Sequence, residues 1–85
     1  MVLFEAPVEV VGTTTLVRLP QHASRELPSR GQVSVGGTLD GHAFQTVVEP
    51  DGLRGHWIRI PQELQQAADL VVGSHASVAI EPTPE

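Results

Sequence analysis

The stretch VSVGGTLDGHAFQTVV, residues 33–48, decides the fold that this sequence predicts. Apolar and polar residues alternate on both sides of Asp40–Gly41, and Asp-Gly between two such runs is the typical loop of a two-residue β-hairpin. We expect a type I′ turn, in which both loop residues have positive φ. Because the loop has only two residues, Leu39 is paired with His42. The stretch therefore predicts an antiparallel hairpin of fixed register.

A third strand is expected beside this hairpin. A turn centred near Gly52 would return the chain as HWIRI (56–60) and set Val48 opposite His56. In this register one face forms the core, and it consists of Val33, Val35, Phe44, Val48, Ile58 and Ile60. Gly37 lies opposite Phe44, which leaves room for the aromatic ring. The other face carries Ser34, Gln45, Val47, Trp57 and Arg59.

The sequence HWIRIPQ (56–62) nearly repeats TLVRLPQ (15–21). Each copy belongs to a strand that leads through a proline into a helical segment and then into another strand. These segments are strands 14–19 and 55–60, helices 20–27 and 61–71, and strands 31–39 and 74–81. With strands 3–11 and 42–49, they predict a mostly β protein, a closed six-stranded barrel with two short helices. Two units related by a pseudo-two-fold axis would close such a barrel without exposed edges.

Length, charge and composition limit the classes of protein. The chain of 85 residues is expected to form one domain, 1–85, with 81–85 as a loose tail. Its net charge is −5, and its basic residues are five arginines and no lysine, which argues against binding nucleic acid through the phosphates. Neither a signal peptide nor an apolar run of membrane-spanning length is recognisable, so we expect a cytoplasmic protein without a membrane partner.

Three short motifs carry a family resemblance. VRLP (17–20), GTLDGHAF (37–44) and GHWIRI (55–60) resemble the bacterial family called domain of unknown function 1905, and the likeness extends from Phe4 to Ile80. The resemblance implies a small β-barrel domain, found alone or fused to other small domains, and no established reaction. Residues 58–81 are also similar to one arm of the swapped-hairpin transcription regulators, which bind DNA as dimers. The acidic charge and the Asp-Gly hairpin do not fit that role.

Four residues are candidates for ligand binding. Arg18 and Arg59 occupy equivalent positions of the repeat and could hold a carboxylate or phosphate between them, or each could pair with a nearby acid or stack on Trp57. Each arginine also lies two residues before a helix-starting proline, so we expect an acidic group or a bound anion beside it. Trp57 could form the floor of a pocket, an interface or a second core layer. His56 shares the face of Ile58 and is either a candidate base or a hydrogen-bonded structural imidazole.

The remaining motifs indicate no metal or cofactor site. The four histidines lack the spacing of a metal motif, there is no cysteine, and no cofactor is expected. The favoured function is a small binding or interaction module that takes a small anionic ligand or a protein partner. A small enzyme or an accessory protein of a bacterial biosynthetic pathway is the alternative, and a swapped-hairpin DNA-binding regulator comes third. The sequence leaves a homodimer open.

Overall fold

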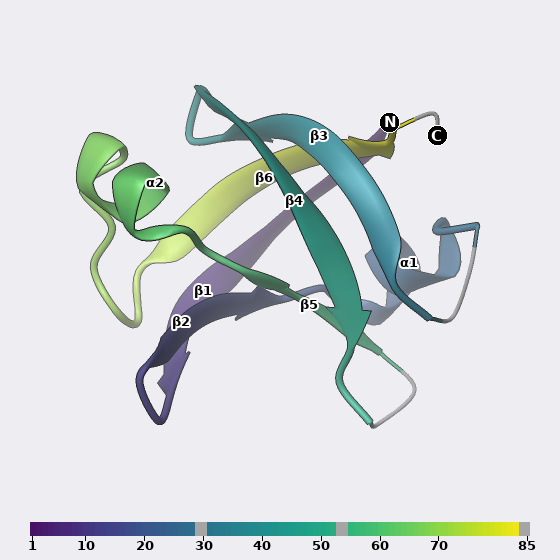
Figure 1. Ribbon diagram of the computed structural model, residues 1–85, viewed down its shortest axis with the longest axis horizontal. Helices are drawn as coiled ribbons and strands as arrows, with labels where there is room; N and C mark the ends of the chain where they lie inside the picture. Colours follow the sequence, from purple (N-terminus) through teal and green to yellow (C-terminus); the bar gives the residue numbers. More distant parts are fainter. Residues whose placement is uncertain (29–30, 53–54, 84–85) are drawn as a thin grey trace.

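The computed structural model describes residues 1–28, 31–52 and 55–83. The described chain contains six strands and two short helices: β1 (Val2–Val11), β2 (Thr14–Arg18), α1 (Gln21–Arg25), β3 (Val33–Leu39), β4 (His42–Pro50), β5 (His56–Arg59), α2 (Gln62–Ala67) and β6 (His75–Pro82). The strands close into an antiparallel barrel in the order β1-β2-β5-β4-β3-β6 (Figure 1). The predicted fold class, a mostly β closed six-stranded barrel with two short helices, is confirmed. The two described helices are too short to cross a membrane.

The β3–β4 hairpin has the predicted register. Leu39 pairs with His42 and Val33 with Val48. The loop residue Asp40 has a φ of 49°, and Gly41 has a φ of 86°, as a type I′ turn requires. The hairpin loop is also tied to β6: the backbone N–H of Asp40 donates to the carbonyl oxygen of Ser77, and the Asp40 carboxylate accepts from the N–H of Ser77, both at 2.8 Å.

The predicted register between β4 and β5 is wrong by two residues. Val48 lies opposite Ile58, and His56 lies opposite Pro50 instead of Val48. The reason is the connection between the strands, which runs from Asp51 to Gly55. Asp51 donates its N–H to the Gly55 carbonyl and accepts the Gly55 N–H on its side chain, so the loop is centred one residue later than expected. Since the shift is an even number of residues, every side chain stays on its predicted face.

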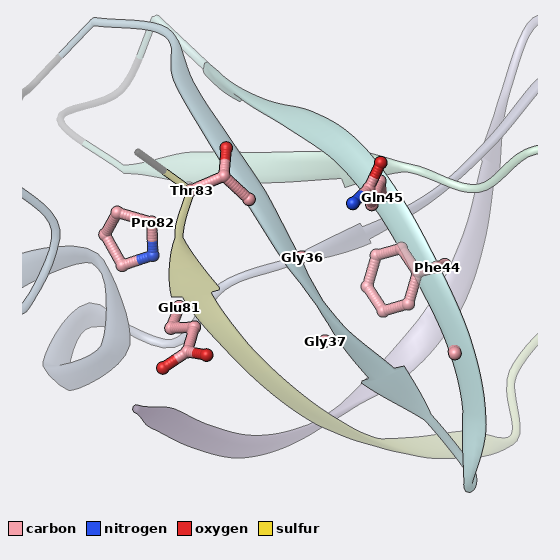
Figure 2. Close-up of a pocket in the computed structure, with 8 residues that line it drawn as sticks. Gly36, Gly37, Phe44, Gln45, Glu81, Pro82 and Thr83 are labelled. Atoms are coloured by element: carbon pink, nitrogen blue, oxygen red, sulfur yellow. The ribbon is translucent and has the colours of Figure 1, made fainter. Parts of the chain in front are cut away.

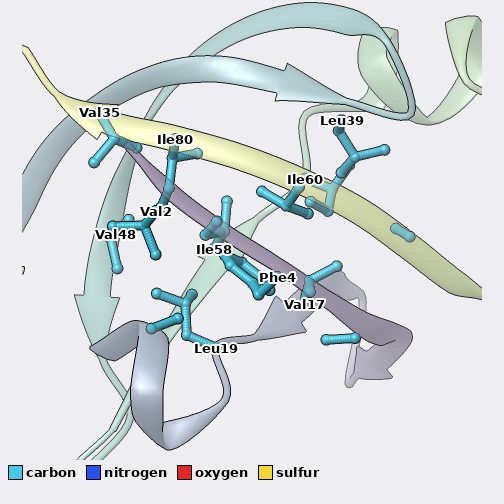
Figure 3. Close-up of a cluster of buried hydrophobic side chains, with 14 of the residues drawn as sticks. Val2, Phe4, Val17, Leu19, Val35, Leu39, Val48, Ile58, Ile60 and Ile80 are labelled. Carbon is cyan, nitrogen blue, oxygen red and sulfur yellow. The ribbon is translucent and has the colours of Figure 1, made fainter. Parts of the chain in front are cut away.

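The core fills the interior of the barrel, and each of the six strands contributes to it (Figure 3). Five of the six core residues predicted from the central strands are buried: Val33, Val35, Val48, Ile58 and Ile60. Phe44 is the exception, because it is only partly buried and packs against the edge of the core. β1 alternates as far as Val8, with Phe4, Ala6 and Val8 inside, whereas Val10, which the same alternation would place inside, is exposed.

Both helices are shorter than expected. α1 covers Gln21–Arg25 within the predicted range 20–27, and α2 ends at Ala67 instead of residue 71. Asp69 adopts a left-handed φ of 53°, which prevents the helix from continuing to residue 71. Leu64 is buried against the core, whereas Val71 lies beyond the end of α2 and is exposed.

The loose tail predicted from residue 81 is wrong for the residues that the structure describes. Glu81 pairs with Gly36, Pro82 pairs with Val35, and the N–H of Thr83 donates to the Ser34 carbonyl at 2.9 Å. β6 continues this far because it closes the barrel along the whole of β3. Residues 84–85 lie outside the described part of the chain.

Hydrogen bonds at the contact of β2 with β5 are matched between the two copies of the repeated sequence. The N–H of Leu19 donates to the His56 carbonyl, and the N–H of Ile60 donates to the Thr15 carbonyl, both at 2.9 Å. Leu19 and Ile60 are equivalent in the repeat, as are Thr15 and His56. The pseudo-two-fold repeat stays a prediction, and these matched bonds support it.

Two adjacent glycines of β3 have different surroundings. A Cβ atom at Gly37 would overlap the carbonyl oxygen of Ala79 and would lie 2.9 Å from the Cα of Ile80, both on β6. Gly37 therefore permits the close approach of β6, a stronger requirement than the room for Phe44 that the sequence suggested. A Cβ atom at Gly36 would lie 3.4 Å from the Thr83 side chain, which is an ordinary contact.

We predict that Gly37→Ala lowers the free energy of unfolding by at least about 3 kcal/mol, because β6 would have to move away from β3. The matched control, Gly36→Ala, should change it by less than about 1 kcal/mol. Urea denaturation of both variants measures the difference. Equal stability of the two variants would contradict the close crossing at Gly37.

Candidate functional site

Arg18, Trp57 and Arg59 lie together on the outer face of β2 and β5. Arg18 is directly opposite Trp57 in the ladder, and its guanidinium carbon lies 5.2 Å from the centre of the indole ring. The Nε of Arg18 lies 3.3 Å from a carboxylate oxygen of Glu9, and its Nη1 lies 3.6 Å from one of Asp51. Stacking and ion pairing therefore both hold this guanidinium, the two alternatives to a ligand role that the sequence raised.

Arg59 has the equivalent partner in the second hairpin. Its Nε lies 2.7 Å from a carboxylate oxygen of Glu49, on β4. In each case the glutamate belongs to the strand that precedes the arginine, at a diagonal position of the ladder. The acidic group expected beside each arginine is present within the chain. An anion held by Arg18 and Arg59 stays a prediction, and it would have to compete with these carboxylates.

Leu16 and Trp57 form the apolar part of this outer face. Leu16 alternates with the core residue Val17 and so faces outward, yet only 1% of its surface is exposed. Trp57 is partly buried, and its indole Nε1 is buried without a hydrogen-bond partner in the described structure. The burial of Leu16 favours a small second apolar layer over an open pocket at this position.

His56 is separated from the other three candidates. It points into the barrel with 3% of its surface exposed, and its Nδ1 lies 3.2 Å from the Oγ of Ser24 on α1. The tautomer decides which of the two atoms donates. The other ring nitrogen is buried without a partner among the described residues. The four candidates therefore do not form one site, and His56 lines none of the surface grooves described next.

A groove that the sequence did not indicate crosses the outer face of β3. Its volume is about 620 Å³, and it is lined by Gly36, Gly37, Ala43, Phe44, Gln45, Glu81, Pro82 and Thr83. Figure 2 shows the ring of Phe44 and the side chain of Gln45 on one side of the glycines, and Glu81, Pro82 and Thr83 on the other. The groove exists because Gly36 has no side chain between its ladder neighbours, Gln45 and Glu81.

Two further grooves meet the first at Gln45. One, of about 490 Å³, continues along β3 and β4 past Ser34 and Val47. The other, of about 340 Å³, lies between β4 and α2 and is lined by His42, Ala43, Phe44, Gln45, Pro61, Glu63, Leu64 and Ala67. The middle of β4 is thus the part of the described surface where hollows on both of its sides converge.

The chemistry of the large groove is simple. Glu81 is its only ionisable side chain, and its carboxylate has no hydrogen bond or ion pair with the described residues. Across the described residues, no group of three or more histidine, aspartate and glutamate side chains is placed to hold a metal ion. The two consecutive glycines were the sequence signal for this groove, but they indicate a surface hollow only once β6 is known to be the neighbour of β3.

Comparison with protein-family models gives a match. The sequence model of a protein family described as "Domain of unknown function (DUF1905)" matches residues 4–80, nearly the whole chain. No protein with curated annotation matches the sequence significantly.

We predict that Ser24→Ala lowers the free energy of unfolding by about 1–3 kcal/mol, because both ring nitrogens of His56 would then be buried without a partner. Combining it with His56→Leu removes both polar groups and should recover most of the loss. Chemical denaturation of the two variants tests this. A double variant less stable than Ser24→Ala alone would show that His56 has another role in the barrel.

We predict that Arg59 and Glu49 are coupled by about 0.2–1 kcal/mol, because the pair is partly exposed, and that added salt weakens the coupling. Thermal unfolding of Arg59→Ala, Glu49→Ala and the double variant measures it, and the same cycle with Arg18 and Glu9 is the matched comparison. Arginine variants as stable as the parent protein would instead favour a ligand-binding role.

Proposed function

This chain belongs to the domain of unknown function 1905 family, and on that premise we propose that it is a binding module that holds its ligand on the outer face of β3 and β4. The observation that carries the proposal is the convergence of three grooves on Gln45. Binding sites are concave and combine apolar walls with few polar groups, and the groove over Gly36 has this composition.

A binding role agrees better with these side chains than a catalytic one. Acid–base catalysis needs ionisable groups within reach of the reacting atoms, and the large groove offers the single carboxylate of Glu81. The buried histidine, His56, lies inside the barrel and lines none of the grooves at Gln45. A ligand suited to the large groove places an apolar part against Phe44 and a positively charged or hydrogen-donating group near Glu81.

A small anion between Arg18 and Arg59 is the second candidate. It is supported by the position of both guanidiniums on one outer face, across adjacent strands. Binding there requires that Glu9 and Glu49 release the arginines, which reduces the affinity by the free energy of both ion pairs.

We predict that small organic amines bind at the groove over Gly36. Titration of the ¹⁵N-labelled protein with a set of aromatic amines should shift the amide signals of residues 36–37, 43–45, 81 and 83. Gly36→Val fills the groove without entering the core and should weaken binding at least tenfold, whereas Gly36→Ala should weaken it less. A matched set of aromatic carboxylates is the control. Shifts confined to Arg18, Trp57 and Arg59, and produced by the carboxylates, would contradict the proposal and support the second candidate.

A further inference from the structure

The barrel is closed by its strand order, but one part of β4 has a free backbone edge. β5 pairs with β4 only from Val48 to Pro50, whereas β3 pairs with it from His42 to Val48. The segment of β4 before Val48 thus has a strand on one side only. In Figure 1, β4 and the chain leading from β5 to α2 diverge along this segment.

The direction of each backbone group in β4 follows from the bonds of β3. The Ser34 carbonyl accepts from the N–H of Thr83, and the Asp40 N–H donates to the Ser77 carbonyl. The backbone N–H and C=O groups of even-numbered residues of β3 therefore point toward β6. Its odd-numbered residues face β4, where they bond to even-numbered residues 42–48. The backbone groups of Ala43 and Gln45 therefore point to the side without a strand. Their N–H and C=O groups have no partner among the described residues.

The equivalent edge of β1 is protected, and the edge of β4 is not. The N–H of Val8 donates to the Ser74 carbonyl, so the backbone groups of even-numbered residues of β1 point toward β6. Those of odd-numbered residues point to the opposite side, where β2 pairs with β1 only from Val8 onward. That edge carries the charged Glu5 and Pro7, which lacks an N–H. Charges and proline prevent a further strand from adding to an edge. The edge of β4 has neither at Ala43 and Gln45.

We propose that the free edge of β4 binds an extended segment of a partner protein, which adds to the barrel as a further strand between β4 and α2. The groove at this edge supplies the side-chain contacts: Phe44 on β4 and the exposed Pro61 and Ala67 on the opposite side provide apolar surface. Strand addition of this kind takes its affinity from backbone hydrogen bonds and its specificity from alternate side chains.

The charge of the groove selects the partner. Glu63 lies in it, its carboxylate has no ion pair among the described residues, and the whole chain has a net charge of −5. The bound segment therefore alternates apolar residues, which face Phe44 and Ala67, with basic ones. A second copy of this chain fits less well, because its own acidic residues and its own α2 would have to enter the same groove.

This inference rests on the proposed function and specifies the partner. Its first test needs only the free protein. Amide hydrogen exchange should alternate along β4: slow at Phe44 and Thr46, which bond to β3, and at least tenfold faster at Ala43 and Gln45. Equal protection along the strand would overturn the proposal, because the edge would not be free.

The second test uses the peptide acetyl-Arg-Val-Arg-Val-Arg-amide, which should bind with a Kd below about 1 mM and slow exchange at Ala43 and Gln45. Exchange at Leu3 and Glu5, on the protected edge, should not change. Two N-methylated forms keep the charge of the peptide, one modified at both valines and one at the central arginine. Because alternate amides face β4, one form should lose at least tenfold in affinity and the other no more than about threefold.

Variants at Gln45 provide the matched controls. Gln45→Pro removes an N–H that β3 does not use and should abolish peptide binding, whereas Gln45→Ala keeps the backbone and should bind the peptide. If Gln45→Pro fails to fold, the N-methylated peptides decide the question on the unmodified protein.

The outcomes separate this inference from the function on which it rests. Amine binding at Gly36 without peptide-dependent protection of Ala43 and Gln45 overturns strand addition and leaves the binding module intact. Equal sensitivity to both N-methylations overturns strand addition as well. Protection that rises with protein concentration in the absence of peptide, together with the mass of a dimer, would assign the edge to a second copy and overturn the partner proposed here.

Discussion

The close approach of β6 to β3 at Gly37 is the constraint on which the barrel depends. β3 is bonded on one side to β4, its hairpin partner, and on the other to β6, the last strand, so it closes the sheet. A side chain at Gly37 would occupy the position of the Ala79 carbonyl. The same pairing brings Glu81 and Thr83 beside Gly36, which faces outward. Gly37 thus permits the barrel to close, and Gly36 leaves a groove between the residues that this closure brings together.

Two pairs of neighbouring strands use their outer faces differently. Across β2 and β5, arginines pair with glutamates around Trp57 and the buried Leu16, so both guanidiniums already have partners within the chain. Across β3 and β4, small side chains alternate with unpaired polar groups, and the grooves at Gln45 are the result. The backbone groups of Ala43 and Gln45 and the carboxylate of Glu81 lie on this second side and have no partner among the described residues, which is the physical reason for placing the binding surface there.

Local sequence predicted the hairpin register, because the two-residue Asp40–Gly41 loop admits one pairing, and alternation then placed most of the core. The prediction misplaced β5 by two residues, because the sequence of the longer loop between β4 and β5 does not determine which residues pair at its two ends. Stacking of Arg18 on Trp57 was one alternative that the sequence left open, and the pairing of β2 with β5 decides for it, together with the ion pair to Glu9. The groove at Gly36 could not be predicted, because it depends on a partner strand more than forty residues away. The burial of His56 followed from its parity with Ile58, but its Ser24 partner depends on how α1 packs.

The pairing of the first strand with the last has a consequence for the order in which the chain folds. β1 and β6 lie side by side along Val2–Pro7, so most of β1 has no partner on that side until β6 has been synthesised. The β1–β2 and β3–β4 hairpins involve short loops and can form early, whereas closure brings together residues separated by nearly the whole chain. A nascent chain that ends before β6 therefore exposes the apolar face of β1, and the barrel becomes a cooperative unit only after β6 has been synthesised.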